Sequence, residues 1–79
     1  MYEIYGRSNC ASCTNAINLL ESLDELYVYY NIEESDYWLN QFKKEWPGRK
    51  TVPAISKYGE KIGGYEDLRE WVSKHSTNE

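Results

Sequence analysis

Cys10 and Cys13 lie three positions apart in the segment GRSNCASCTNA and are the two cysteines of a 79-residue chain. Such a pair can belong to a metal site, form a structural disulfide or work as a redox-active dithiol. A structural zinc site takes four ligands, typically Cys and His, whereas this chain offers one histidine, the distant His75. A structural bridge across so short a loop removes little unfolded-state entropy, roughly 2 kcal/mol. The pattern therefore favours a working dithiol.

A helix is predicted directly after the first cysteine. Apolar residues recur at helical spacing through residues 11–23, and this predicts a helix with one buried stripe. Ser8 or Asn9 is expected to cap its start by accepting a backbone N–H. At a helix start, residues i and i+3 lie within the Cα separation of about 4.4–6.8 Å that a disulfide tolerates. The two cysteines can therefore bond reversibly.

The same helix start assigns a different role to each sulfur. Cys10 falls at or just before the first turn, where unpaired N–H groups and the helix dipole favour an anion. Its pKa is expected to be lowered, and the thiolate is the attacking species. Cys13 lies one turn further in, so it is more shielded and suits the role of resolving thiol. Arg7 adds positive potential near both.

The rest of the chain alternates strand and helix patterns. Residues 2–5 alternate as a strand does, and the apolar run 26–30 predicts a strand buried on both faces. A second helix is expected around Trp38 and Trp46, capped by Ser35 or Asp36 and stopped at residues 47–48. A hairpin with its turn at residues 59–60 follows, then a third helix after residues 63–64 whose apolar stripe ends at His75.

The predicted order is β-α-β-α-β-β-α in a single domain spanning residues 1–79, with residues 76–79 expected to fray. A mixed sheet covered by three helices is the layered solution for this pattern, so the fold class is α/β.

Composition and charge exclude several classes of function. The net charge is −4, from nine Lys plus Arg against thirteen Asp plus Glu, and no basic stripe indicates nucleic-acid binding. No apolar run is long enough to span a bilayer, and no basic start followed by an apolar stretch indicates export. We therefore expect a cytoplasmic protein with no nucleic-acid or membrane partner. In that compartment a close cysteine pair usually serves metal or redox chemistry.

Three motifs together resemble the glutaredoxin family. They are Cys10-Ala11-Ser12-Cys13 after a strand, Thr51-Val52-Pro53, and GGYEDL at residues 63–68. With the element order, the likeness covers about residues 2–75, at the size of the short bacterial and phage glutaredoxins. It implies a thioredoxin-like fold with a four-stranded mixed sheet and three helices. It also implies a cis Val52–Pro53 bond, with the Val52 backbone facing the cysteines and pairing with the substrate's peptide group.

The resemblance further implies a glutathione site. The backbone N–H groups around Tyr65 and Glu66 would take the γ-glutamyl carboxylate, and the side chain of Asp67, or alternatively Glu66, its ammonium group. The alternative for these acids is that they only complement the helix dipole. No metal ligand is expected. The expected glutathione-binding residues are Arg7, Arg49, Lys50, Thr51, Val52, Pro53, Gly64, Tyr65, Glu66 and Asp67.

Arg49 and Lys50 stand where the family carries cations for the glycine carboxylate of glutathione. Arg7 stands where the family commonly has lysine, and an arginine can grip a carboxylate with two hydrogen bonds. The alternative is that residues 49–50 form a solvated basic turn. Trp38 and Trp46 are expected in the core, and Tyr65 as a wall of the groove.

By this resemblance the chain is a glutathione-dependent oxidoreductase that reduces protein disulfides and glutathione mixed disulfides, as a monomer. Ribonucleotide reductase is a frequent client of such proteins. The family's commonest active-site tetrapeptide has proline and tyrosine where Ala11 and Ser12 stand here, a change expected to alter thiolate pKa and redox poise. Some glutaredoxins without that proline bind a [2Fe–2S] cluster between two chains with glutathione. Three alternatives therefore stay open: a cluster-binding dimer, a redoxin reduced by thioredoxin reductase, and an interaction domain whose cysteines are idle.

Overall fold

The computed structural model describes residues 1–75, apart from the side chain of His75, so the expected roles of that side chain and of residues 76–79 lie outside the described part. The elements follow the predicted order. They are β1 (Tyr2–Gly6), α1 (Ala11–Ser22), β2 (Tyr27–Asn31), α2 (Asp36–Glu45), β3 (Ala54–Lys57), β4 (Glu60–Gly63) and α3 (Tyr65–His75).

The strands form one mixed sheet in the order β2-β1-β3-β4. β1 pairs in parallel with β2 and antiparallel with β3, and β3 and β4 form an antiparallel hairpin. The first three elements thus form a parallel βαβ unit. Because β1 lies inside the sheet, the loop that follows it starts from a fixed position. That loop carries Cys10.

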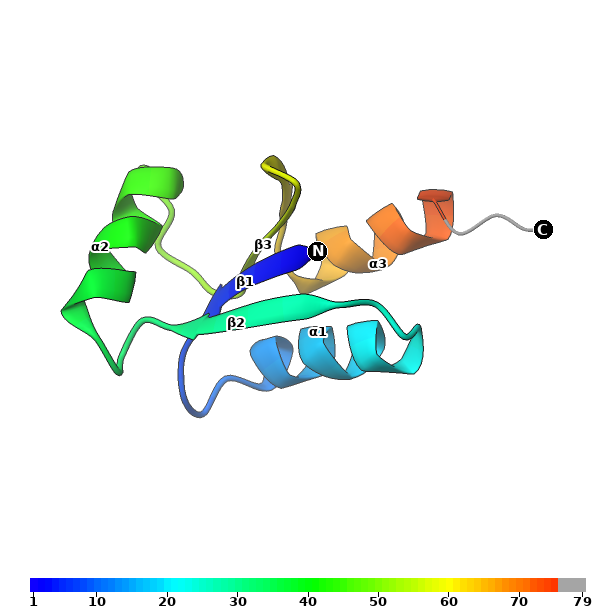
Figure 1. Cartoon of the computed structure of the whole chain (residues 1–79), viewed down its shortest axis with the longest axis horizontal. Helices are drawn as coiled ribbons and strands as arrows, with labels where there is room; N and C mark the ends of the chain where they lie inside the picture. Colours follow the sequence, from blue (N-terminus) through cyan, green and yellow to red (C-terminus); the bar gives the residue numbers. More distant parts are fainter. Residues whose placement is uncertain (76–79) are drawn as a thin grey trace.

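Helices cover both faces of the sheet (Figure 1). On one face, α1 and α3 contribute Ala16, Leu20 and Leu68 to a cluster that also contains Ile4 and Ile55, all 0% exposed. On the other face, α2 places Phe42 against Tyr5 and Ala54, with the half-buried Trp38 and Trp46 packed around them. Full burial of a leucine or isoleucine side chain of the first cluster stabilises the fold by about 1.5–3 kcal/mol. The tryptophans line the core, as predicted.

The strand predicted at residues 26–30 is present as β2, but the prediction that it is buried on both faces is wrong. β2 is the outermost strand of the sheet. All five of its residues are half-buried, and Leu26 lies before the strand with 71% of its surface exposed. The run reads as apolar because it is rich in tyrosine, whose ring packs inward while its hydroxyl reaches polar partners. Tyr27, for example, donates a hydrogen bond to Glu21 at 2.6 Å.

The prediction for the start of the first helix is also wrong in detail. Neither Ser8 nor Asn9 caps α1. The N-cap is Cys10, whose Sγ accepts the backbone N–H of Cys13. Asn9 instead adopts a left-handed conformation with φ of 53°, which turns the chain into the helix. At α2 the predicted cap is confirmed, since the side chain of Ser35 accepts the N–H of Tyr37.

Candidate active site

Cys10 and Cys13 form a disulfide, with a Cα–Cα separation of 5.2 Å that lies in the predicted range. The N–H of Cys13 donates to the Sγ of Cys10 at 3.1 Å. The Cys10 sulfur therefore occupies the place of a helix-capping oxygen, where the first-turn amides and the helix dipole favour negative charge. In the reduced protein this arrangement favours the thiolate of Cys10 over its thiol.

The two sulfur-bearing residues differ in exposure. Cys13 is 2% exposed, whereas Cys10 is half-buried. Gly6 makes this burial possible, because a Cβ at that position would lie 3.0 Å from the Sγ of Cys13 and 2.6 Å from the ring of Tyr29. The prediction that the second cysteine is the shielded one is confirmed.

The loop between β1 and α1 is tied to the end of β2. The hydroxyl of Tyr29 donates to the carbonyl of Arg7 at 3.1 Å, and the N–H of Ser8 donates to Glu33 at 3.2 Å. Burial first, then the nearby carboxylates of Glu34 and Glu33, raise the pKa of Tyr29 above its usual value, so its hydroxyl keeps its proton to a higher pH than that of a free tyrosine. Sequence reasoning missed Tyr29 because nothing local links a strand tyrosine to a loop 22 residues earlier.

The second part of the site is the loop before β3. The Val52–Pro53 bond is cis, as the family resemblance implied. The carbonyl oxygen of Val52 lies 3.9 Å from the Sγ of Cys10, so this backbone borders the reactive sulfur. Arg49 crosses the same loop and donates to the carbonyls of Thr51 and Pro53.

The third part is the turn that leads into α3. Gly63 has φ of 126°, in the left-handed range that favours glycine. Gly64 precedes the helix, and Asp67 accepts its N–H at 3.0 Å through Oδ2. This is one half of a capping box. Because Gly64 has no side chain, it cannot cover the N–H groups of the helix's first turn. Tyr65 packs against the core below.

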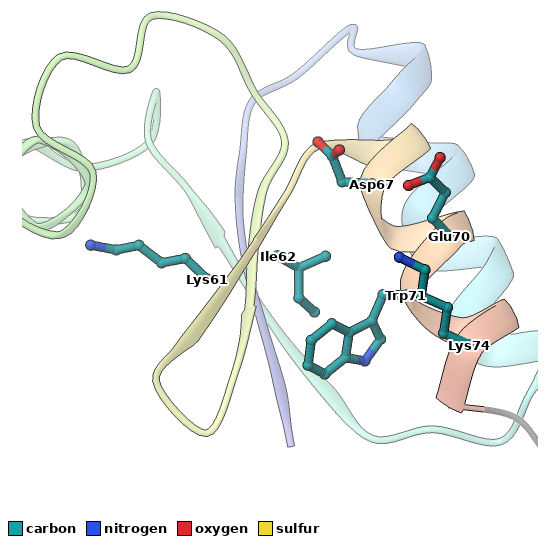
Figure 2. A pocket seen from close by; sticks show the side chains of 6 residues that line it. All are labelled: Lys61, Ile62, Asp67, Glu70, Trp71 and Lys74. Atoms are coloured by element: carbon teal, nitrogen blue, oxygen red, sulfur yellow. The ribbon is translucent and has the colours of Figure 1, made fainter.

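The two acids of this turn have different surroundings. Glu66 pairs with Arg69 at 3.3 Å on the exposed surface of α3, an arrangement that contributes little to stability. Asp67 borders a groove of about 290 Å³ between β4 and α3. Figure 2 shows the groove with Ile62 and Trp71 beside each other, Asp67 near the start of α3, and Lys61 directed away toward the α2 side. The sequence did not reveal this groove, because its walls belong to two separate elements.

The cations expected at the site also differ. Arg7 and Lys50 are exposed and Arg49 is half-buried. Among the described side chains the pair between Glu66 and Arg69 is the one ion pair, so no described carboxylate pairs with Arg7 or Lys50. The structure therefore brings Cys10, the Val52–Pro53 backbone, Arg49 and Gly64 together, with two unneutralised cations on the flanking loops.

These parts can carry out disulfide exchange. A sulfur activated by amide groups, a second shielded sulfur in bonding range and an open backbone beside them are what the reaction requires. No group of three or more His, Cys, Asp or Glu side chains able to hold a metal ion occurs in the part of the chain that the structure describes. Together with its thioredoxin-like fold, the site defines a thiol–disulfide oxidoreductase.

Comparison with known proteins gives the family. A sequence model of the glutaredoxin family matches residues 2–62, and the chain belongs to that family. Glutaredoxin 1 of Escherichia coli is 33% identical over 79 residues, an alignment that covers 91% of this chain and 92% of that protein. With its paired cysteines, this chain is a dithiol glutaredoxin.

Solved structures agree on the fold. The structure of reduced E. coli glutaredoxin has a TM-score of 0.75 and 34% identity, and the match covers 92% of this chain and 93% of that one. A buckwheat glutaredoxin in complex with glutathione has a TM-score of 0.78 at 21% identity, over 94% of this chain and 69% of that one.

In residues 1–75, no helix combines the length and apolar character needed to cross a membrane.

Proposed function

We propose that glutathione is the electron source of this oxidoreductase and binds across the three parts of the site. The observation that carries the proposal is the position of the Cys10 sulfur, which accepts the N–H of Cys13 at 3.1 Å and lies 3.9 Å from the Val52 carbonyl. A peptide-like ligand bonded to that sulfur meets the backbone of Val52 directly. The buckwheat relative, solved with glutathione, supports the same choice of ligand.

The reaction begins when the Cys10 thiolate attacks one sulfur of the substrate disulfide. A new S–S bond forms while the old one breaks, and the departing sulfur leaves as a thiolate that takes a proton from solvent. For a protein substrate, Cys13 loses its proton and attacks the Cys10 sulfur. The second substrate sulfur is released, and the Cys10–Cys13 disulfide remains.

Two glutathione molecules restore the dithiol. The first thiolate attacks Cys10, bonds to it and frees Cys13 as a thiolate that is then protonated. The second attacks the sulfur of the bound glutathione, so that glutathione disulfide leaves and Cys10 returns to its thiolate. Two electrons pass from two glutathione thiols to one substrate disulfide. A substrate that already carries glutathione on its sulfur needs Cys10 alone.

The bound glutathione would use charges of both signs. Its γ-glutamyl carboxylate meets the open N–H groups of Tyr65 and Glu66 at the start of α3, where the helix dipole favours an anion. Its ammonium group meets Asp67, which borders an open groove, whereas Glu66 already pairs with Arg69.

The middle of the ligand lies along residues 51–53 and Gly64. The combined positive potential of Arg7, Arg49 and Lys50 draws its glycine carboxylate toward this loop.

Single-cysteine variants test the proposal. With a glutathione mixed disulfide as substrate, Cys10→Ser should lose at least about a thousandfold in rate, because no activated thiolate remains. Cys13→Ser should retain activity on that substrate and lose it on a protein disulfide. Activity that survives in Cys10→Ser and disappears in Cys13→Ser would show that the two roles are reversed.

The choice of reductant needs its own measurement. Turnover is compared with glutathione plus glutathione reductase and with thioredoxin reductase plus NADPH. Turnover with glutathione supports the proposal, whereas turnover with thioredoxin reductase alone assigns the chain to the redoxins that accept electrons from that enzyme.

A further inference from the structure

Arg49 makes more contacts within the active-site loop than the other cations of the site. Its Nε donates to the carbonyl of Thr51 at 3.0 Å, and its Nη2 donates to the carbonyl of Pro53 at 3.2 Å. These are the carbonyls of the residues on either side of Val52. One planar guanidinium thus bridges the backbone immediately before and after the residue that borders the Cys10 sulfur.

Two further contacts hold this guanidinium in place. Its Cζ lies 5.2 Å from the ring centroid of Trp46, within the range of a cation–π interaction. A Cβ at Gly64 would lie 3.2 Å from Nη2, so the turn before α3 approaches Arg49 closely. Arg49 is therefore confined between α2, its own loop and the Gly64 turn.

Lys50 has the opposite surroundings. Its side chain is exposed, and no residue of the described part of the chain makes a hydrogen bond or ion pair with it. Arg49 has already directed two N–H groups at backbone oxygens, whereas the ammonium group of Lys50 keeps all its donors. A carboxylate approaching this loop gains more from the free cation than from the committed one.

We propose that Arg49 is a positioning residue. It holds the Val52 backbone beside Cys10 for any peptide-like disulfide, while Lys50 takes the glycine carboxylate of glutathione. The half concerning Lys50 rests on the proposed use of glutathione; the half concerning Arg49 does not. Because disulfide exchange needs the attacking sulfur aligned with its target, a loop displaced by even about 1 Å slows the reaction strongly.

The test measures single-turnover rates of the reduced protein with three disulfides. The first is glutathione disulfide. The second is its diester with both glycine carboxylates blocked. The third is the symmetric disulfide of a cysteine tripeptide with acetylated and amidated ends, which carries peptide groups and no charge. In each reaction the Cys10 thiolate forms a bond to one sulfur and the other sulfur leaves as a thiolate. Alkylation of Cys10 by iodoacetamide across pH reports on the sulfur without using the loop.

Arg49→Lys keeps the positive charge but replaces the planar fork, which reaches two carbonyls from two nitrogens, by a single nitrogen, so it should slow all three disulfides by a similar factor, about tenfold. In this variant the rate of Cys10 alkylation should stay within about twofold of wild type at each pH. Lys50→Ala should slow glutathione disulfide more than its diester. Lys61→Ala is the matched control, since it removes the other cation near Trp46, at 5.6 Å from the ring, and should change none of these rates.

Other results overturn the proposal. If Arg49→Lys slows only glutathione disulfide, Arg49 binds the carboxylate. If it slows nothing, the two hydrogen bonds are irrelevant to exchange, and if alkylation falls equally, the residue acts on the sulfur or on the whole fold. If wild type shows no preference for glutathione disulfide over the tripeptide disulfide, the proposed function fails. The tripeptide rates of Arg49→Lys still decide the positioning role.

Discussion

Helices α1 and α3 both begin at the active site, and their starts are built in opposite ways. At α1 the capping position holds Cys10, whose sulfur accepts the N–H of Cys13. At α3 the residue before the helix is Gly64, and Asp67 binds back to its N–H. The first helix start carries its anion within the chain, whereas the second leaves its donors open, and the carboxylate of the proposed glutathione would bind there.

This difference shows that the side chain at the capping position decides whether a helix start can serve catalysis or binding. Free N–H groups and the dipole are the same in both helices. A sulfur placed among them becomes a nucleophile, and a glycine placed before them leaves a receptor for a carboxylate. The α2 start, capped by the hydroxyl of Ser35, is the purely structural version.

The largest expected effect is at the entry to α3. In Gly63→Ala the alanine must adopt a φ of 126°, which side chains disfavour, and its Cβ collides with Asp67. The free energy of unfolding should therefore fall by about 3 kcal/mol. Gly59→Ala is the matched control, because its φ is 82° and a Cβ there meets nothing within 4 Å. Urea unfolding measures both, and equal losses would show that the contact with Asp67 is unimportant.

A second prediction separates the receptor at α3 from the nucleophile at α1. Asp67→Asn removes the charge proposed for the ammonium group of glutathione, so the KM for glutathione should rise about tenfold, while alkylation of Cys10 keeps its rate. Glu70→Gln removes one acid from the same helix and the same groove, and it should leave KM unchanged. A similar rise in both variants would mean that Asp67 acts only through the net charge of α3.

The capping role of sulfur gives a smaller effect. Under reducing conditions Cys10→Ala should lower the free energy of unfolding by about 1 kcal/mol, because an N–H at the start of α1 loses its acceptor. Cys10→Ser should lose less, since a hydroxyl can cap. Ser35→Ala supplies the reference loss for an ordinary cap at α2. Equal stability of the Ala and Ser variants in urea would contradict the assignment of a cap to Cys10.

The smallest effect concerns Tyr29, which ties the loop before α1 to β2. Its pKa is raised by burial and by Glu34 and Glu33, so the folded protein keeps the phenol proton to higher pH than the unfolded chain does. The resulting stabilisation is present below about pH 10 and is lost as pH rises through the folded pKa. Tyr29→Phe should remove this component from urea unfolding measured between about pH 9 and 11, and Tyr58→Phe, at an 83% exposed position, is the control.

Local patterns predicted most of the fold. The order of the elements and the cap of α2 follow from periodicity and from residues within one turn of each other. The outer position of β2 does not follow, because a tyrosine-rich run looks buried until the order of the strands is known. Strand order depends on contacts between distant segments, and it is not written in any one of them.

The site divides in the same way. The bonding distance between the two sulfurs and the shielding of the second could be predicted, since the helix start that positions them is local. The capping sulfur was missed because Ser8 and Asn9 are stronger caps by residue type, yet Ser8 accepts a hydrogen bond from Asn31 instead. The double hydrogen bond of Arg49 was missed because it depends on how one loop folds back on itself.

The contrast in burial between the two cysteines has a practical consequence. Cys13 is 2% exposed, so a thiol-reactive dye added to the reduced protein should attach at Cys10 without any mutation. A fluorophore there stands beside the Val52–Pro53 loop, and its emission would respond when that loop moves. The chain thus already contains a single labelling position, and a label there reports on this loop in a protein whose exchange reaction is blocked.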